Sequence, residues 1–567
     1  MNAFEQIQHA FAQCLIQEFQ IPAQIIANSQ FDLNPDADKQ NFGDINANIA
    51  MICAQKLKKN PKILAQEIVT KFQHPFVARI EIAGPGFLNF FLTQAWFATI
   101  AQEIFEQQDE FFKNSEKNLD GEARRSKLNA KSGDQVLKPK KINIEFVSAN
   151  PTGPMHVGHG RNGILGDVLA NILKFLNQDV SKEFYINDAG AQIIKLGQSF
   201  KIRCLQELGQ NISLPEDAYH GQSLIDLAKV CAAEFGKNLE HEPDNFFQNY
   251  AKDFMLKELQ STLKNYGILF DVWFSEKNLH DHGKVAQALQ KLIATGHTYE
   301  HDGAVWLRST TFGDDKDRVL VKSSGEPTYI LPDVAYLIDK FERGFNELIM
   351  ILGHDHHSYK TRMQVIMQVL GYDQKRLQVI LYQLVQIMKD GTPVKMSKRS
   401  GNMVTLEEVV EEVGKNVARF FFLNRKADAE LHFDLNLALS QSNENPIYYI
   451  QYALVRILSI QKKAAEEKTI SAKKITEPCS NMEKLLIKKI CAFKALITNI
   501  ASNHQIHLLA HDTSELATLF HQYYNQQRII DAAAPKETAH RLFIVDLMQQ
   551  NLKLALFLMG ITPMEKM

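Results

Sequence analysis

Residues 141–159 read Lys-Ile-Asn-Ile-Glu-Phe-Val-Ser-Ala-Asn-Pro-Thr-Gly-Pro-Met-His-Val-Gly-His, and this stretch decides the fold. Its first seven residues form a short β-branched run that is typical of a buried parallel strand. Pro151, Gly153 and Pro154 break the strand. From residue 156 to 176, apolar residues recur at helical spacing. The pattern therefore predicts a strand, a turn and a helix within a parallel α/β sheet.

Two histidines fall where the predicted helix begins. Free backbone N–H groups and the positive end of the helix dipole favour a phosphate there. His156 and His159 are three residues apart, so they share one helix face. Gly158 between them allows a nucleotide to approach the backbone closely. The alternative is a pair of surface histidines at a helix cap.

A second segment, residues 391–401, reads Gly-Thr-Pro-Val-Lys-Met-Ser-Lys-Arg-Ser-Gly. Glycines bracket a basic run, which predicts a loop. Lys395, Lys398 and Arg399 can close over a triphosphate as point charges or as a fork. An ordinary solvated basic loop is the alternative. The position of this segment downstream of the first one favours a function with nucleotide.

Together the two segments resemble the signatures of class I aminoacyl-tRNA synthetases. The HIGH-like signature comprises Ala149, Asn150, Pro151, Thr152, Gly153, Pro154, Met155, His156, Val157, Gly158 and His159. The KMSKS-like signature comprises Lys395, Met396, Ser397, Lys398 and Arg399. The resemblance implies ATP binding and catalysis by His156, Gly158, His159, Lys395 and Lys398.

Longer stretches resemble arginyl-tRNA synthetases in particular. They are residues 145–161, residues 185–193 (Tyr-Ile-Asn-Asp-Ala-Gly-Ala-Gln-Ile) and residues 445–453 (Asn-Pro-Ile-Tyr-Tyr-Ile-Gln-Tyr-Ala). The resemblance implies an arginine–tRNA ligase. Such an enzyme activates L-arginine with ATP and Mg²⁺ to arginyl-adenylate and pyrophosphate. It then transfers arginine to the 3′-terminal adenosine of tRNA(Arg) for protein synthesis.

Arginine recognition requires carboxylates placed for forked hydrogen bonds, because a guanidinium is planar and always charged. By similarity to the family, Tyr329 and Asp333 contact the guanidinium. Glu145, Asn150 and His159 then hold the α-amino and carboxylate end of the substrate. The alternative for Asp333 is the N-cap of a helix.

Residues 353–357, Gly-His-Asp-His-His, follow a strand-like run at residues 348–352. Ligands bind at the carboxyl ends of strands in open α/β sheets. We therefore expect Gly353, Asp355 and His356 to contact adenosine. A metal is the alternative, but adjacent histidines cannot easily all reach one ion, so no metal site is predicted.

Composition sets limits on the class of protein. A length of 567 residues predicts three or four domains. The net charge of −2 gives no nucleic-acid signal by itself. No apolar run approaches ~18 residues and the N-terminus has Glu5 rather than a basic leader, so we expect a chain that neither spans a membrane nor is secreted. We further expect a cytoplasmic monomer. Six cysteines without a Cys-x-x-Cys pair argue for a reducing compartment and against structural zinc: Cys14, Cys53, Cys204, Cys231, Cys479 and Cys491.

A local basic region is the visible candidate for RNA contact. Residues 456–494 carry ten Lys or Arg against four Glu, in a helix-like pattern preceded by tyrosines. Aromatic rings beside basic helices suit unstacked anticodon bases, so Tyr448, Tyr452 and Arg456 are predicted to bind tRNA. A solvated helical face is the alternative.

The predicted organisation is a multidomain α/β protein with five parts. They are an N-terminal α+β tRNA-elbow domain (1–97), a flexible linker (98–140), a Rossmann-like catalytic domain (141–390) with an insertion at about 201–304, a signature-loop and stem-contact region (391–442) and an all-α helix-bundle anticodon domain (443–567). By the resemblance, Phe87 and Asn89 of the first part meet a D-loop base.

Two rival functions remain beside this interpretation. One is a nucleotidyltransferase that adenylates a small acid without RNA, and the helical C-terminal part counts against it. The other is a tRNA-binding relative that has lost catalysis, and the two intact signatures count against it. The chain departs from the family in two places: residues 452–456, Tyr-Ala-Leu-Val-Arg, keep only the arginine of a His-Ala-Arg pattern, and residues 563–567 replace Pro-Glu-Arg-Met with Pro-Met-Glu-Lys-Met.

Overall fold

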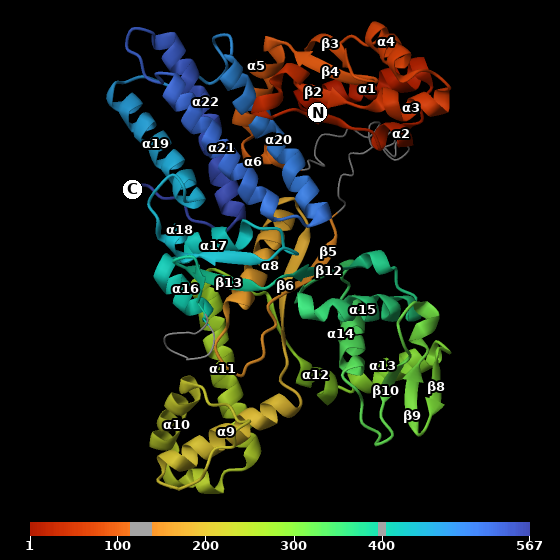
Figure 1. The fold of residues 1–567 in the computed structure, drawn as a ribbon, viewed down its shortest axis with the longest axis vertical. Coiled ribbons are helices and arrows are strands. Elements are labelled where there is room, and N and C mark those ends of the chain that lie inside the picture. The colour runs from red at the N-terminus through yellow and green to blue at the C-terminus, as the bar shows by residue number, and fades with distance from the viewer. Residues whose placement is uncertain (114–138, 395–403) are drawn as a thin grey trace.

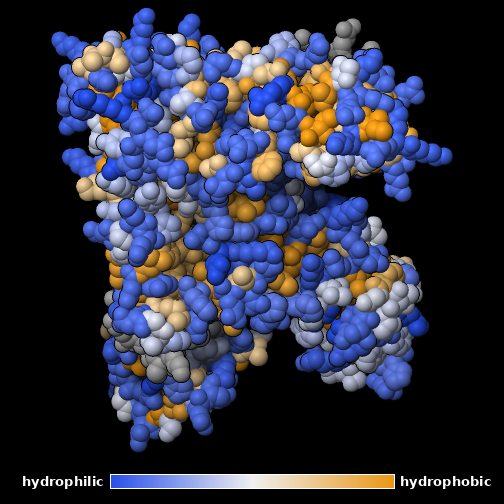
Figure 2. Space-filling view, turned by 45° about the horizontal axis from the view of Figure 1, so that its top comes forward, coloured by the Kyte–Doolittle hydropathy of each residue, from blue (hydrophilic) through white to orange (hydrophobic). Residues whose placement is uncertain are grey.

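The computed structural model describes residues 1–113, 139–394 and 404–567. An N-terminal α+β unit and a C-terminal helix bundle stand side by side above a parallel sheet (Figure 1), which confirms the predicted fold class. The face in Figure 2 is largely hydrophilic, and a wide notch separates its two lower lobes. Within the three described ranges, no helix is long and apolar enough to cross a membrane.

The N-terminal unit is a four-stranded antiparallel sheet in the order β1-β2-β4-β3, packed against helices. Asn2 and Glu5 cap its first helix, α1, reciprocally. The elements are α1 (Ala3–Phe19), α2 (Ala23–Ala27), β1 (Phe31–Leu33), η1 (Ala37–Phe42), β2 (Ile45–Ala47), α3 (Ile49–Leu57), α4 (Pro61–Lys71), β3 (Val77–Ala83), β4 (Phe87–Leu92), α5 (Gln94–Gln107) and α6 (Asp109–Phe112).

The predicted linker at residues 98–140 is wrong over its first part. Helices α5 and α6 continue to Phe112, and their apolar side chains, which recur at helical spacing, are buried. The ring centroids of Phe112 and Phe493 lie 5.6 Å apart, edge to face. Residues 114–138, which make up more than half of the predicted linker, lie outside the described residues.

Five parallel strands form the central sheet in the order β12-β11-β5-β6-β7. The predicted strand and helix are confirmed as β5 and α8. The strand order reverses at β5, and ligands bind in α/β sheets at such a reversal. The elements are β5 (Lys141–Glu145), α8 (Val157–Phe175), β6 (Asp179–Ile186), β7 (Val272–Ser275), α14 (Ile330–Glu342), β11 (Glu347–Gly353), η4 (His354–His356), α15 (His357–Val369), η5 (Gln374–Arg376) and β12 (Leu377–Tyr382).

The predicted insertion at residues 201–304 is wrong in its continuity, because the sheet strand β7 interrupts it. A helical excursion precedes β7, and an antiparallel sheet in the order β10-β9-β8 follows it. Both project away from the N-terminal unit and the bundle (Figure 1). The elements are α9 (Ala191–Glu207), α10 (Gln222–Phe235), η2 (Gly236–His241), α11 (Asp244–Tyr266), α12 (Glu276–Asp281), α13 (Lys284–Ala294), β8 (Thr298–His301), β9 (Ala304–Leu307), η3 (Ser309–Phe312) and β10 (Arg318–Val321).

A small sheet and short helices connect the catalytic sheet to the bundle. Strand β13 pairs antiparallel with β14 and parallel with β15. The C-terminal region is helical, as predicted. The elements are β13 (Val385–Lys389), β14 (Thr392–Pro393), α16 (Leu406–Val413), α17 (Lys415–Leu423), β15 (Leu431–Asp434), α18 (Leu435–Leu439), α19 (Pro446–Glu466), α20 (Asn481–Asn503), α21 (His507–Gln526) and α22 (Pro535–Leu558).

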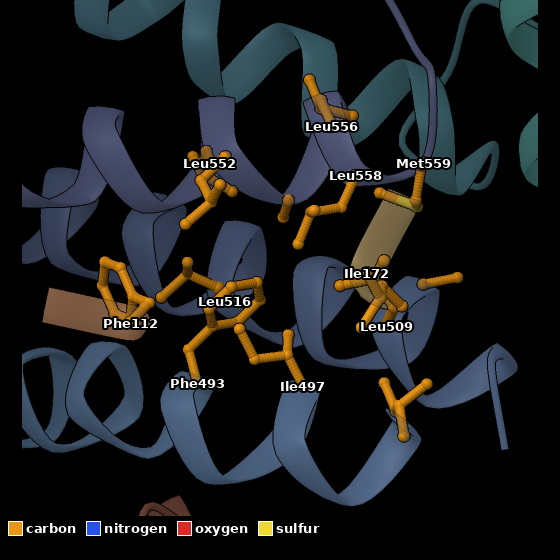
Figure 3. Close-up of a cluster of buried hydrophobic side chains, with 14 of the residues drawn as sticks. Phe112, Ile172, Phe493, Ile497, Leu509, Leu516, Leu552, Leu556, Leu558 and Met559 are labelled. Carbon is orange, nitrogen blue, oxygen red and sulfur yellow. The ribbon is translucent and has the colours of Figure 1, made fainter. Parts of the chain in front are cut away.

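Two lysines of α20 join the N-terminal unit to the bundle. Lys488 Nζ lies 2.8 Å from Asp44 Oδ1, and Lys494 Nζ lies 2.8 Å from Glu5 Oε1. The prediction that these cations belong to an RNA-binding patch is therefore wrong. Apolar side chains from α6, α8, α20, α21 and α22 meet in one cluster (Figure 3).

Candidate active site

The turn between β5 and α8 has an unusual backbone. Val147 and Ser148 have φ angles of 64° and 42°, in a region that residues other than glycine rarely adopt. The Val147 N–H donates to Asn162 Oδ1 at 2.8 Å, and the Tyr185 N–H donates to Ser148 Oγ at 3.1 Å. Such strain persists where the surroundings hold it, typically at functional sites.

The two predicted histidines are brought together at the start of α8. Their ring centroids lie 3.7 Å apart. His156 is the N-cap residue, and its Nδ1 accepts the Gly158 N–H at 3.0 Å. In the neutral ring this leaves the proton on Nε2, which becomes a donor for a ligand.

Burial lowers the pKa of both histidines, and that of His159 to about 3 with the nearby His156 as the second cause. Both rings are therefore neutral at pH 7, and they offer hydrogen bonds rather than positive charge.

Gly158 has a packing function beside its predicted ligand function. A Cβ atom at this position would lie 2.8 Å from Cε1 of His156. Such a separation is too short for a real contact, so any other residue would displace the imidazole. The close approach of a nucleotide here stays a prediction.

The second signature lies in residues 395–403, outside the described residues. The structure therefore does not test the predictions for Lys395, Met396, Ser397, Lys398 and Arg399. The segment that follows, from residue 404 onward, contacts the first signature. The Leu406 N–H donates to Met155 O at 2.9 Å, and His156 and Thr405 form an antiparallel bridge.

Asp333, in the first turn of α14, lies among the carboxylates Glu145 and Glu276, and this group is named the acidic pocket. The N-cap of α14 is Tyr329, so the helix-cap alternative for Asp333 is wrong. Burial raises the pKa of Asp333 to about 8, and the negative charges of Glu145 and Glu276 add to the effect. Arg362 and Lys340 only partly oppose this shift. The pocket is therefore short of positive charge, as a site for a cation requires.

Glu145 already has a partner. Its Oε2 lies 2.5 Å from Lys340 Nζ, and both side chains are buried. Behind this pair, Arg343 Nη1 and Nη2 donate to the two carboxylate oxygens of Glu183 at 2.6 and 2.8 Å. The charges behind the pocket are thus neutralised within the protein.

The sequence analysis missed Glu276, the first residue of α12. Burial raises its pKa, and the Tyr185 side chain hydrogen bonds to it. Its charge also acts on Asp333. The signal would have been a carboxylate at the end of a sheet strand, but β7 is only four residues long and was not recognised.

Tyr329 is 66% exposed at the edge of this pocket. The Arg362 guanidinium carbon lies 5.7 Å from the centroid of its ring. Asn150 and His159 line a cleft of about 310 Å³ at the signature turn. The other lining residues are Ala149, Thr152, Gly153, Pro154, Met155 and His156.

Gly353 ends the strand β11, and the exposed residues Asp355 and His356 follow it at the carboxyl edge of the sheet. Their contact with adenosine stays a prediction. In residues 1–113, 139–394 and 404–567, no group of three or more His, Cys, Asp or Glu side chains is placed to hold a metal.

The two predicted elbow contacts differ in exposure. Phe87 and Asn89 are two residues apart on β4, so their side chains lie on the same face of the sheet. Phe87 is 37% exposed, whereas Asn89 is buried. A Cβ atom on Gly43 would lie 3.2 Å from Asn89 Cβ, so the backbone at Gly43 covers this residue. An RNA contact by Asn89 stays a prediction, and it requires that segment to move.

The predicted anticodon contacts form one face of α19. The ring centroids of Tyr448 and Tyr452 lie 6.4 Å apart. The Arg456 guanidinium carbon lies 4.4 Å from the ring centroid of Tyr452 and 4.4 Å from that of Tyr524 on α21. Stacked rings beside a guanidinium are suited to unpaired bases.

Three family models match consecutive parts of the chain. The arginyl tRNA synthetase N-terminal domain matches residues 5–92, the class I tRNA synthetase (R) catalytic domain matches 125–432, and the DALR anticodon binding domain matches 450–567.

Named relatives agree with these matches. An arginine–tRNA ligase of Bacillus licheniformis is 40% identical over 579 residues and covers 100% of both chains. That of Bacillus subtilis is 39% identical over 98% of this chain and 96% of the relative. The structure of Thermus thermophilus arginyl-tRNA synthetase is 20% identical with a TM-score of 0.74, covers 99% of this chain and 100% of that one, and shows the same fold. The chain therefore belongs to the arginyl-tRNA synthetase family of the class I aminoacyl-tRNA synthetases.

Proposed function

We propose that this chain joins arginine to tRNA(Arg) in two steps, as its family membership supports. L-arginine and ATP give arginyl-adenylate and pyrophosphate, and the arginyl group then passes to the 3′-terminal adenosine. The observation that carries the proposal is the acidic pocket of Asp333 and Glu276 at the carboxyl end of the sheet, where Arg362 and Lys340 only partly offset the charge of the carboxylates.

In this proposal, Asp333 and Glu276 accept hydrogen bonds from the substrate guanidinium. Tyr329 covers the guanidinium at the edge of the pocket. The neutralised Glu145, with Asn150 and the HIGH-like turn, faces the α-amino and carboxylate end. A carboxylate–guanidinium pair is both forked and charge-assisted, which favours arginine over lysine.

The substrate carboxylate is already a nucleophile, so no covalent enzyme intermediate is needed. His156 and His159 donate hydrogen bonds to phosphate oxygens through neutral rings, and they need not change protonation state during the reaction. Lys395 and Lys398 add positive charge where negative charge develops on the phosphate oxygens in the transition state. Mg²⁺ bound with ATP would offset phosphate charge.

We further propose that Phe87 and the α19 face of Tyr448, Tyr452 and Arg456 contact tRNA. The enzyme then acts as a monomer, because substrate sites and RNA contacts are all supplied by one chain. Its six free cysteines fit a cytoplasmic location.

The experiment is ATP–pyrophosphate exchange with each amino acid, with and without tRNA. Exchange with arginine alone among the amino acids is expected, and the family resemblance predicts that it requires tRNA. Robust exchange with a different amino acid would contradict the proposed function. Exchange from arginine and ATP without tRNA would contradict only the tRNA requirement.

Phe87→Ala tests the elbow contact. Stacking on an aromatic ring stabilises a base by ~1–3 kcal/mol, so the KM for tRNA rises roughly ten-fold while the KM for arginine stays unchanged. Ile63→Ala is the matched control, because Ile63 is an exposed apolar residue of the same unit at 53% exposure. A lower melting temperature with a normal tRNA KM would show that Phe87 has only a packing function.

A further inference from the structure

We infer that Arg419 is a positioning residue for amino-acid activation, because it fixes the signature helix α8 to the C-terminal end of α22. The inference rests on the proposed function and adds a residue far from either signature. It concerns how the histidine pair is held in place rather than which groups touch the substrate.

Arg419 is fully buried on α17 and binds three separate elements. Its Nη2 lies 2.5 Å from Asp167 Oδ2 on α8. Its Nε donates to Met559 O at 2.9 Å, directly after α22, and its Nη1 donates to Tyr266 O at 3.3 Å at the end of α11. One guanidinium thus joins the catalytic helix, the helical excursion and the bundle.

The end of α22 is shaped around this side chain. Gly560 has a φ of 66°, and a Cβ atom there would lie 2.2 Å from Arg419 Nη2. A second contact runs in parallel, because Asn171 Nδ2 on α8 donates to Leu558 O at 3.2 Å. In Figure 3, Ile172 of α8 lies beside Leu509 and Met559, so apolar packing closes the same junction.

The geometry links this junction to the chemistry. His156 caps the start of α8, and Asp167 lies eleven residues further along the helix. Eleven residues of helix span about 16 Å. A helix of this length moves as a rod, so a shift at Asp167 becomes a shift of the histidines. Misplacement by about 1 Å costs up to about a hundred-fold in rate, because transition-state contacts need close alignment.

The decisive variant is Arg419→Lys, which keeps the charge and loses the fork that reaches two backbone carbonyls. We expect the kcat of arginine-dependent pyrophosphate exchange, counted per active site and with saturating tRNA, to fall about ten-fold. The KM values for arginine and tRNA should change less than two-fold. Asn171→Ala, a milder change on α8, should lower kcat in the same way by about two- to three-fold.

The matched control is Asn416→Ala on the same helix α17. Asn416 and Thr562 exchange two hydrogen bonds of 3.2 Å, which hold the C-terminal segment without touching α8. We expect its kcat to equal that of the unaltered chain, even where its melting temperature falls. This separates the position of α8 from general loosening of the tail.

Normal kcat per active site in both Arg419→Lys and Asn171→Ala would overturn the inference, and so would an equal kcat loss in Asn416→Ala. Where Arg419→Lys fails to fold, Asn171→Ala against Asn416→Ala decides alone. The absence of arginine-dependent exchange in the unaltered chain would instead overturn the proposed function.

Discussion

The charged side chains at the two ends of helix α14 differ in whether the protein itself supplies a partner of opposite charge. At its start, Asp333 faces other carboxylates, and no ion pair within the described part of the chain includes it. Further along, Lys340 is paired with Glu145, and Arg343 is paired with Glu183. The structural carboxylates Glu145 and Glu183 are paired with cations of the same chain. The carboxylate proposed to bind substrate, Asp333, would be paired by the guanidinium of the substrate. Such a site lowers the stability of the empty protein in favour of function.

The largest effect is expected at the paired end. Lys340→Met leaves Glu145 buried without its cation, and this costs about 3–5 kcal/mol of unfolding free energy. Chemical denaturation at pH 7 measures it. Lys284→Met is the control, since Lys284 and Glu342 form an exposed pair of 2.8 Å that contributes ~0–1 kcal/mol. Equal losses in the two variants would remove the distinction between the two ends of α14.

Asp333→Asn should act on binding rather than on folding. Loss of the ionised partner weakens arginine by ~2–4 kcal/mol, seen as a higher KM for arginine with that for ATP unchanged. The folded-state pKa of about 8 lies above the ordinary 3.8. The stability linked to this group is therefore present below pH 4 and is lost as pH rises to 8. The variant should melt above the unaltered chain at pH 8.5, and the gap should close towards pH 4; an unchanged arginine KM would exclude Asp333 from the pocket.

Glu276→Gln tests the neighbouring carboxylate. The amide still accepts a hydrogen bond from Tyr185 but offers the guanidinium no charge, which should weaken arginine by ~1.5–3 kcal/mol. Removing the charge also removes one cause of the raised pKa of Asp333. The pH above which the KM for arginine falls should then be lower in the variant than in the unaltered chain. A pH profile identical to that of the unaltered chain would show that Glu276 does not act on Asp333.

The smallest effect is the pH dependence of the unaltered chain. Binding of a cation requires ionised Asp333, and with a pKa of about 8 only a minor fraction is ionised at pH 7. The KM for arginine should therefore fall roughly ten-fold between pH 7 and pH 9. Calorimetry in buffers of different ionisation enthalpy should detect proton release on binding. Asp333→Asn is the control and should lose the dependence.

Local patterns predicted one part of this molecule and missed another. The strand, turn and helix at residues 141–176 follow from alternating breakers and apolar spacing, which act between near neighbours. Strand β7 was missed because four residues give no period, and Glu276 was missed with it. The lysines of α20 were misassigned because Asp44, the partner of Lys488, lies 444 residues away in sequence. Partners at such distances are visible only once the chain has folded.

The junction between α20 and the N-terminal unit has a mechanical consequence. Lys488, Lys494 and Phe112 fasten the unit that carries Phe87 to the bundle that carries the α19 face. The two surfaces proposed to contact tRNA are therefore held at a separation that is set when the protein folds. On this proposal, an RNA of the matching span reaches both surfaces without having to align them first, so less orientational freedom is lost on binding. The proposal thus makes the span of the RNA a criterion of selection, because an RNA too short or too bent to reach both surfaces loses one contact whatever its bases.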